Sequence, residues 1–185
     1  MSEITVLLGQ ARGGDAAAWD RVVHLLYADL KRLARSASGE HGQDVTALVH
    51  DCYLRLEKTG AGQIESRAHF LSTAAMAMRQ LVINHARDRV AHKRGGGQSH
   101  TTLGKVDLDA THAAQCEAEE LLLIDTALRR LGAVDARLVR VVECRLFAGL
   151  SEEETAAALE LPLRSAQRLW QQAREQLRVL LDDAA

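Results

Sequence analysis

The segment Ser151–Arg178 constrains the fold of this chain more than any other part, because it contains a helix start, a break and a second helix. Ser151 and Glu154 have the Ser-x-x-Glu spacing of a capping box, which predicts a helix that begins at Ser151. Pro162 suits the first turn of the next helix, where its missing N–H costs little. A left-handed backbone at Glu160, where many such turns have glycine, would cost roughly 1–2 kcal/mol. The segment therefore predicts a helix-turn-helix.

The second of these helices has two chemically different faces. Apolar residues recur at helical spacing and predict a buried stripe of Leu163, Ala166, Trp170, Ala173 and Leu177. The opposite face carries Arg164, Gln167, Arg168, Gln171 and Arg174. Arg and Gln can form bidentate hydrogen bonds with guanine and adenine edges in the major groove, so this face is a candidate DNA reader. A solvated helical hairpin would show the same pattern, and that interpretation stays open.

The rest of the composition favours an all-α protein. The chain has 185 residues, one proline and 3% aromatic residues, and no long run alternates β-branched with polar residues. Basic residues dominate from Arg87 to Lys105, and acidic residues dominate from Asp107 to Asp125. Residues 95–115 begin with three glycines and are rich in Ser, Thr and Asp, which is typical of a linker. We therefore predict two small helical domains, residues 1–94 and 116–185, joined by a flexible acidic linker at residues 95–115.

Apolar periodicity and capping residues predict the helices of these domains. Asp15 and Ser66 can each cap the helix that follows them. The expected helices cover about residues 4–11, 16–38, 44–58, 67–92, 115–131 and 135–147. Their candidate core residues are Trp19, Val22, Val23, Leu26, Leu30, Leu33, Leu48, Cys52, Leu56, Phe70, Ala74, Ala77, Leu81 and His85.

Several functional classes are disfavoured by the sequence. Cys52, Cys116 and Cys144 are few, odd in number and far apart, which argues against disulfides and for a reducing cytoplasm. No Cys-x-x-Cys or His-x-x-x-His pair occurs, and no glycine-rich phosphate loop follows a strand. The N-terminus is too polar for a signal peptide, and no apolar run approaches membrane-spanning length. We expect no catalytic residue, metal, cofactor or membrane contact.

Three segments have an order and spacing that match one known family: Leu48–Leu56 (LVHDCYLRL), Phe70–Arg94 and Phe147–Glu154 (FAGLSEEE). They resemble the polymerase-binding helix, the promoter-melting helix and the helix-turn-helix entry of bacterial RNA polymerase sigma factors of the extracytoplasmic-function (ECF) group. The resemblance covers nearly the whole chain.

The resemblance implies a division of labour between the two domains. The N-terminal domain would bind the clamp of core RNA polymerase and open the downstream promoter element, with a loop at about residues 58–69 holding a flipped base. The C-terminal domain would sit on the polymerase flap and read the upstream element, using Arg164, Ser165, Gln167, Arg168, Gln171, Arg174 and Arg178. The downstream residues would be Arg79, Gln80, Arg87, Arg89, Lys93 and Arg94. The polymerase-binding residues would be Asp44, Thr46, Leu48, Asp51 and Arg55.

The polymerase-binding segment departs from the family's acidic pattern. Where relatives carry Asp-Ala-Glu-Asp, this chain has Asp44-Val45-Thr46-Ala47, so attraction to a basic clamp should be weaker. We hypothesise that a Ser/Thr protein kinase restores the negative charge by phosphorylating Thr46 near the helix N-terminus and so switches the factor on. Helix capping by the Thr46 hydroxyl is the alternative. The need for an anti-sigma factor stays open.

Other departures leave the melted promoter sequence open. Thr73 replaces a frequent tryptophan, and Arg79-Gln80 replaces the usual Arg-Asn pair. Two other functions remain possible at this point. One is a stand-alone helix-turn-helix regulator that binds operator DNA as a dimer, and the other is a helical adaptor that binds only proteins.

Overall fold

The computed structural model of the protein describes residues 3–38, 44–60, 63–94 and 108–183, and these residues form helices and turns without any strand. The N-terminal part contains α1 (Glu3–Arg12), α2 (Ala16–Ser38), α3 (Val45–Gly60) and α4 (Arg67–Arg94). The C-terminal part contains α5 (Leu108–Val134), α6 (Ala136–Val142), the π-helix η2 (Glu143–Phe147), α7 (Glu152–Ala158) and α8 (Leu163–Asp182). The predicted all-α class is therefore confirmed for the described residues.

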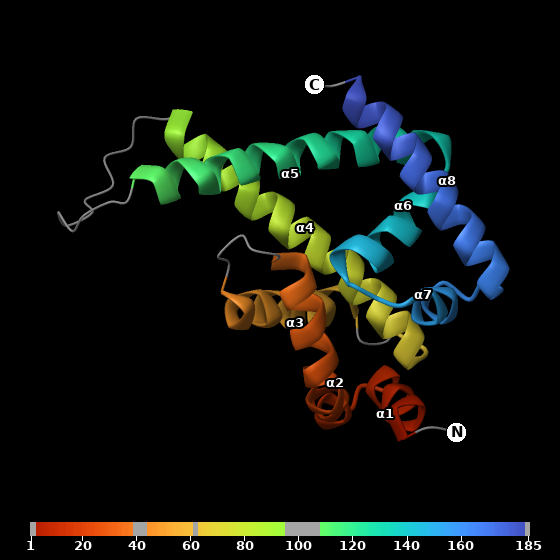
Figure 1. The fold of residues 1–185 in the computed structure, drawn as a ribbon. Coiled ribbons are helices and arrows are strands. Elements are labelled where there is room, and N and C mark those ends of the chain that lie inside the picture. Colours follow the sequence, from red (N-terminus) through yellow and green to blue (C-terminus); the bar gives the residue numbers. More distant parts are fainter. Residues whose placement is uncertain (1–2, 39–43, 61–62, 95–107, 184–185) are drawn as a thin grey trace, which may run out of the picture.

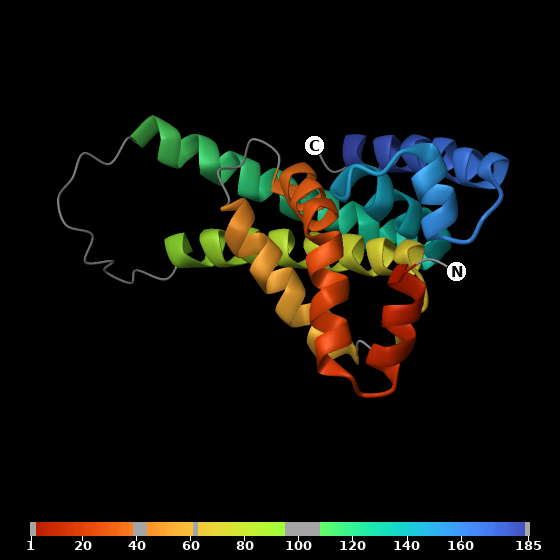
Figure 2. The ribbon, with the colours of Figure 1, turned by 90° about the horizontal axis from the view of Figure 1, so that it is seen from below.

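The long helix α4 runs through the middle of the molecule. It packs against α2 and α3 from the N-terminal part and against α5, η2 and α7 from the C-terminal part. Figure 2 shows α4 lying between these two sets of helices, and Figure 1 shows α5 crossing the upper part of α4 before the chain turns back into α6 and α8. Side chains on several faces of α4 are consequently enclosed by other helices.

Short polar side chains begin most of these helices, because the first N–H groups of a helix have no partner within it. The Asp15 carboxylate accepts a hydrogen bond from the N–H of Ala18 at 3.1 Å. The Ser66 hydroxyl accepts one from His69 at 3.0 Å, at the start of α4. At α7, both hydrogen bonds of the Ser151–Glu154 capping box are present. The three predicted caps are confirmed.

The main hydrophobic core draws on both parts of the chain. Its members from α2 and α4 include Leu26, Leu30, Leu33, Phe70, Ala74 and Met78, all almost completely buried. The same cluster contains Ala118 and Leu121 of α5, Cys144 of η2 and Ala158 of α7. A second cluster joins α5, α6 and α8 through residues such as Leu131, Leu138 and Leu169. The predicted division into two domains thus describes two sets of helices that share apolar surface in this structure.

The predicted linker differs in part from the structure. Residues 95–107 lie outside the described residues, whereas α5 begins at Leu108, so residues 108–115 are helical. The sequence from Leu108 to Gln115 contains one leucine and three alanines, which are good helix formers. Asp109 belongs to the first turn, where the helix dipole favours a negative charge. Asp109 therefore belongs to a helix start rather than to the linker.

Two local features also differ from the predicted pattern. The expected helix over residues 135–147 changes from α6 into the π-helix η2 at Glu143, a form that occurs mostly as single turns. Leu163 is 40% exposed because it occupies the first turn of α8, beyond the packed part of that helix. Leu169 is buried instead, beside Ala166 and Ala173.

The chain adopts the left-handed backbone region at both edges of α7. Gly149 has φ of 61°, and a Cβ atom there would lie 2.5 Å from the Oγ atom of Ser36, so only glycine fits. Glu160 has φ of 54° in the turn before α8, although its side chain is exposed. Non-glycine residues pay a steric cost in this region because Cβ approaches the following carbonyl oxygen.

We predict that Glu160→Gly raises the free energy of unfolding by about 1 kcal/mol, because it removes this steric cost at an exposed position. Gly149→Ala should lower it by at least about that amount, since it introduces both the backbone strain and a clash. Chemical denaturation of the two variants and the wild type measures both changes. A lower stability of Glu160→Gly would contradict the prediction.

Candidate nucleic-acid interface

Helix α8 presents the residues predicted to read the upstream element. Burial of Ala166, Leu169 and Ala173 fixes which side of α8 faces the protein. The opposite side is exposed at Arg164, Arg168, Gln171, Arg174 and Arg178. The two other predicted residues, Ser165 and Gln167, are half-buried at the edge of this surface. All seven therefore lie on one helix, and five of them are open to a partner.

Two contacts hold parts of this surface in place. The Nε2 atom of Gln167 donates a hydrogen bond to the carboxylate of Glu152 in α7 at 2.6 Å. Because a carboxylate can only accept, the amide nitrogen must face Glu152, which leaves Oε1 to accept elsewhere. The guanidinium of Arg174 lies 5.8 Å from the ring centroid of Trp170, in a cation–π contact. These contacts restrict side chains that would otherwise be free to rotate.

Arg79, predicted to contact the downstream element, lies in a different environment. Its Nη2 atom is 2.8 Å from Asp125 in α5, and its Nη1 atom is 2.9 Å from Glu143 in η2. Its side chain is only 13% exposed. In this arrangement Arg79 joins α4 to the C-terminal helices and cannot reach DNA, because burial and two carboxylates already occupy its guanidinium.

The other candidates on α4 lie in four different situations. Arg87 also binds Asp125, with 2.6 Å between Nη2 and Oδ2. Gln80 is exposed and accepts a hydrogen bond from Arg55 of α3. Arg89 is half-buried. Lys93 and Arg94 end the helix, and their side chains lie outside the described residues.

Asp125 and Glu143 were not predicted to be functional residues. They are 6% and 3% exposed, and Asp125 receives hydrogen bonds from three arginines, the third being Arg129 at 2.9 Å. Asp125 lies within the apolar stretch LLLIDTAL, and Glu143 is the one carboxylate in LVRVVEC, where Arg140 is the other charge. A lone carboxylate on an apolar helix face is the sequence signal for such buried pairs, because it needs a partner to be buried.

A second ionic contact joins the two parts of the chain at α7. Arg32 of α2 donates two hydrogen bonds to the carboxylate of Glu154, at 2.8 and 3.1 Å. These hydrogen bonds hold the pKa of Glu154 below its usual range. Glu154 therefore serves both the capping box of α7 and the contact with α2.

The residues predicted to bind polymerase lie on α3 with different exposures. Leu48 is 1% exposed, which confirms it as a core residue and leaves it no surface for a partner in this arrangement. Asp44 and Thr46 are exposed, whereas Asp51 and Arg55 are half-buried. The carboxylate of Asp44 accepts a hydrogen bond from the N–H of Thr46 at 2.8 Å. The capping role suggested for the Thr46 hydroxyl thus belongs to Asp44.

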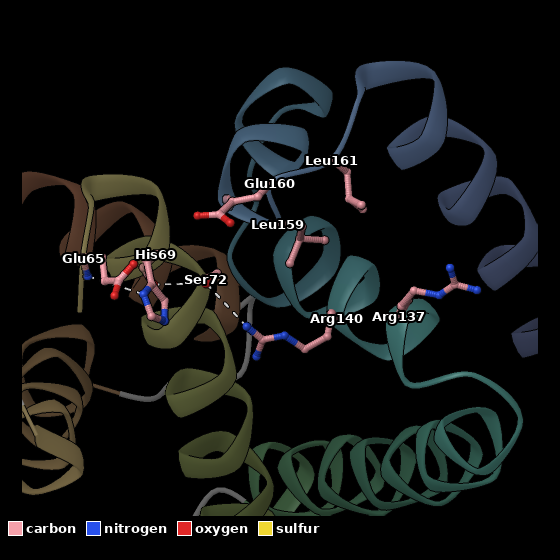
Figure 3. A pocket seen from close by; sticks show the side chains of 9 residues that line it. Glu65, His69, Ser72, Arg137, Arg140, Leu159, Glu160 and Leu161 are labelled. Carbon is pink, nitrogen blue, oxygen red and sulfur yellow. Dashed lines mark hydrogen bonds between the residues drawn. The ribbon is translucent and has the colours of Figure 1, made fainter. Parts of the chain in front are cut away.

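A cavity of about 440 Å³ lies where the start of α4, α6 and the α7–α8 turn meet (Figure 3). Its lining mixes charges of both signs, from Glu65, Glu160, Arg137 and Arg140. The Nη2 atom of Arg140 lies 3.4 Å from the hydroxyl of Ser72, and Arg137 is paired with Asp135. This balance favours neither an anion nor a cation.

The thiols and histidines of the described residues form no obvious chemical site. Burial raises the pKa of both Cys52 and Cys144 to about 12, so these thiols are unreactive near neutral pH. Within residues 3–38, 44–60, 63–94 and 108–183, no three His, Cys, Asp or Glu side chains are grouped to hold a metal. No helix among them combines the length and apolarity that crossing a membrane requires.

The described residues form only helices and turns, with an Arg- and Gln-rich surface on α8. Comparison with known proteins identifies the family of the chain. Residues 1–183 match the family described as ECF sigma factor, so the chain belongs to this family and is a DNA-binding sigma factor that acts with RNA polymerase in transcription. The resemblance inferred from three segments is confirmed. A solved structure of CnrH in complex with the cytosolic domain of CnrY has 21% identity, a TM-score of 0.43 and full coverage of both chains. A comparison with curated proteins gave no match.

We predict that Arg79→Ala lowers the free energy of unfolding by about 1–3 kcal/mol, because it removes charge-assisted hydrogen bonds to two buried carboxylates, which keep their other arginine partners. Arg164→Ala should change it by less than about 0.5 kcal/mol, since Arg164 is an exposed arginine away from such features. Denaturant unfolding compares the two variants directly. Equal, small effects would show that Arg79 does not hold the helices together.

Proposed function

We propose that this protein binds core RNA polymerase and directs it to promoters that carry a specific upstream and downstream element. The observation that carries the proposal is the exposed Arg- and Gln-rich surface of α8, in a chain that belongs to the ECF sigma factors over nearly its full length. The action is confined to recognition and DNA opening, so the chemistry of RNA synthesis belongs to the polymerase. A cytoplasmic location accompanies this role.

Reading of the upstream element is assigned to the first turns of α8. Arg164, Gln167 and Arg168 would reach base edges in the major groove, where each good bidentate contact contributes about 1–3 kcal/mol of discrimination. Arg174 and Arg178 lie further along the helix and would bind phosphates, which set the register without reading sequence. The hydrogen bond from Gln167 to Glu152 supports this assignment, because it leaves the Gln167 oxygen available to accept from an adenine amino group.

Opening of the downstream element is assigned to α4 and the residues before it. Arg89, Lys93 and Arg94 would bind the separated strand, and the loop at residues 58–69 would hold a flipped base. Arg79 and Arg87 could join them only after α5 leaves α4, because Asp125 now occupies both. The N-terminal helices and the α6–α8 helices would then act as separate domains connected through residues 95–115.

Contact with polymerase is assigned to the exposed side of α3 and to the C-terminal helices. Asp44, Thr46 and the half-buried Asp51 form the polar side of α3 that would face a basic clamp. Leu54 is 37% exposed on the same helix and adds an apolar contact. The C-terminal helices would sit on the flap.

Run-off transcription with purified core enzyme tests the proposed function. We expect specific transcripts only when this protein is added, and we expect specific promoter binding to require core enzyme. In a panel of upstream-element variants, Arg168→Ala should relax the preference at one base pair, whereas Arg178→Ala should weaken every sequence alike.

Two outcomes would contradict these assignments. Tight binding to a palindromic site by the protein alone would favour a stand-alone dimeric regulator. Equal effects of Arg168→Ala and Arg178→Ala across the whole panel would show that Arg168 does not read bases.

We further propose that phosphorylation of Thr46 strengthens binding to polymerase. Thr46 is exposed in the first turn of α3, where a helix favours added negative charge. A phosphate would add about −1.5 to −2 charges beside Asp44 and recreate an acidic cluster. The modifying enzyme would be a Ser/Thr protein kinase, and this route needs no anti-sigma partner.

We predict that Thr46→Glu, or kinase treatment of the wild type, raises affinity for core enzyme several-fold over Thr46→Ala, because each adds negative charge at the clamp surface. Equilibrium binding to labelled polymerase measures the three forms. Thr126→Glu places the same charge on an exposed threonine of α5 and should have no such effect. Equal affinity of all Thr46 forms would refute the switch.

A further inference from the structure

A cavity of about 310 Å³ between α3, α4 and α5 is lined by an unusual set of charges. Four arginines contribute to its wall: Arg55, Arg79, Arg87 and Arg129. Asp125 is the carboxylate among the lining residues. The wall therefore carries an excess of positive charge, and Gln80 and Asn84 add neutral polar groups. Such a cavity suits an anion, although Glu143, which is not part of the wall, also binds Arg79.

Asp125 occupies this cavity in the manner of a bound anion. Its Oδ1 atom lies 2.8 Å from Arg79, and its Oδ2 atom lies 2.6 Å from Arg87 and 2.9 Å from Arg129. Arginine binds phosphate oxygens with the same planar, charge-assisted geometry. The Nε atom of Arg79 is nevertheless buried and has no hydrogen-bond partner among the described atoms. Asp125 and Glu143 together thus leave one donor of Arg79 unsatisfied.

We propose that this arginine cavity is a phosphate-binding site for the DNA strand exposed on promoter opening, and that Asp125 fills it in the free protein as an internal substitute for phosphate. This proposal rests on the proposed sigma function. It identifies Asp125 as the residue that keeps the arginines of α4 from binding DNA in the free protein. Promoter phosphates and Asp125 compete for the same guanidinium groups. Exchange of one anion for the other keeps the arginines paired, whereas simple opening would expose them to water without an anionic partner.

The exchange requires α5 to move away from α4. Glu143 of η2, which binds the other side of Arg79, must move together with α5. The contact between Arg32 and Glu154 must break. Binding of α3 and the C-terminal helices to different parts of polymerase would separate the two sets of helices. In the free protein, where α5 covers α4, binding of single-stranded DNA should be weak. Binding to polymerase should expose α4 and strengthen it.

The test measures binding of a fluorescent single-stranded promoter oligonucleotide to the full-length protein without polymerase. We expect Asp125→Asn to bind at least about tenfold more tightly than the wild type, because a larger fraction of molecules has the cavity open. Glu120→Gln removes a charge from an exposed position of the same helix and should bind as the wild type does. The double variant Asp125→Asn, Arg87→Gln should lose most of the gain. Equal binding of Asp125→Asn and wild type would overturn the proposal.

Hydrogen exchange on the wild-type protein provides a second measurement, which does not depend on whether any variant folds. When the oligonucleotide is added in excess, amides of residues 121–131 in α5 should lose protection, because α5 leaves α4. Bound oligonucleotide with unchanged protection of α5 would overturn the proposal.

Competition distinguishes a DNA strand from a free phosphate as the source of the anion. Pyrophosphate at the same phosphate concentration should not displace the oligonucleotide from Asp125→Asn, since it lacks neighbouring phosphates along a strand. Complete displacement would overturn the assignment to DNA. Run-off transcription by wild-type holoenzyme separates this inference from the proposed function. If transcription is normal but Asp125→Asn does not change DNA binding, only the role of Asp125 is refuted. If no specific transcript forms, the proposed sigma function is refuted.

Discussion

The arrangement of this protein depends on a buried ionic cluster in which Arg79 of α4 lies between Asp125 of α5 and Glu143 of η2. The surrounding apolar surface brings these helices together, and the cluster then restricts which face of α4 meets α5. A buried charge pair contributes little net stability compared with apolar packing, but removal of one partner is costly. The cluster therefore disfavours any packing in which one of these charges is buried without the others.

The same cluster separates two kinds of arginine that look alike in the sequence. Arg79 and Arg87 of α4 are held by acidic side chains, whereas Arg164 and Arg168 of α8 are exposed. In this arrangement the surface proposed to read the upstream element is open, whereas two arginines proposed to bind the downstream element are held by Asp125. The two promoter elements would accordingly be engaged under different conditions, with α8 ready and α4 dependent on a change in helix packing.

Local signals were sufficient to predict much of the fold. Asp15, Ser66 and Ser151 each begin a helix because the short polar side chain and the apolar repeat that follows act within one or two turns of chain. The partners of Arg79 could not be predicted in this way, since Asp125 and Glu143 lie 46 and 64 residues further along the chain. The exposure of Leu163 likewise depends on which helices pack together. The sequence thus indicated which residues carry charge, and only the packing shows which of them are available.

The contact between Arg32 and Glu154 has a consequence for proton linkage. Hydrogen bonds from Arg32 lower the pKa of the Glu154 carboxyl in the folded protein. The contact therefore stabilises the packing of α2 against α7 fully at pH values above the ordinary pKa of a glutamate. This stabilisation is lost as the pH falls through the lowered pKa. Ordinary variation around neutrality therefore leaves Glu154 ionised and the contact intact. Acidification within the physiological range would therefore not separate α2 from α7 at this contact.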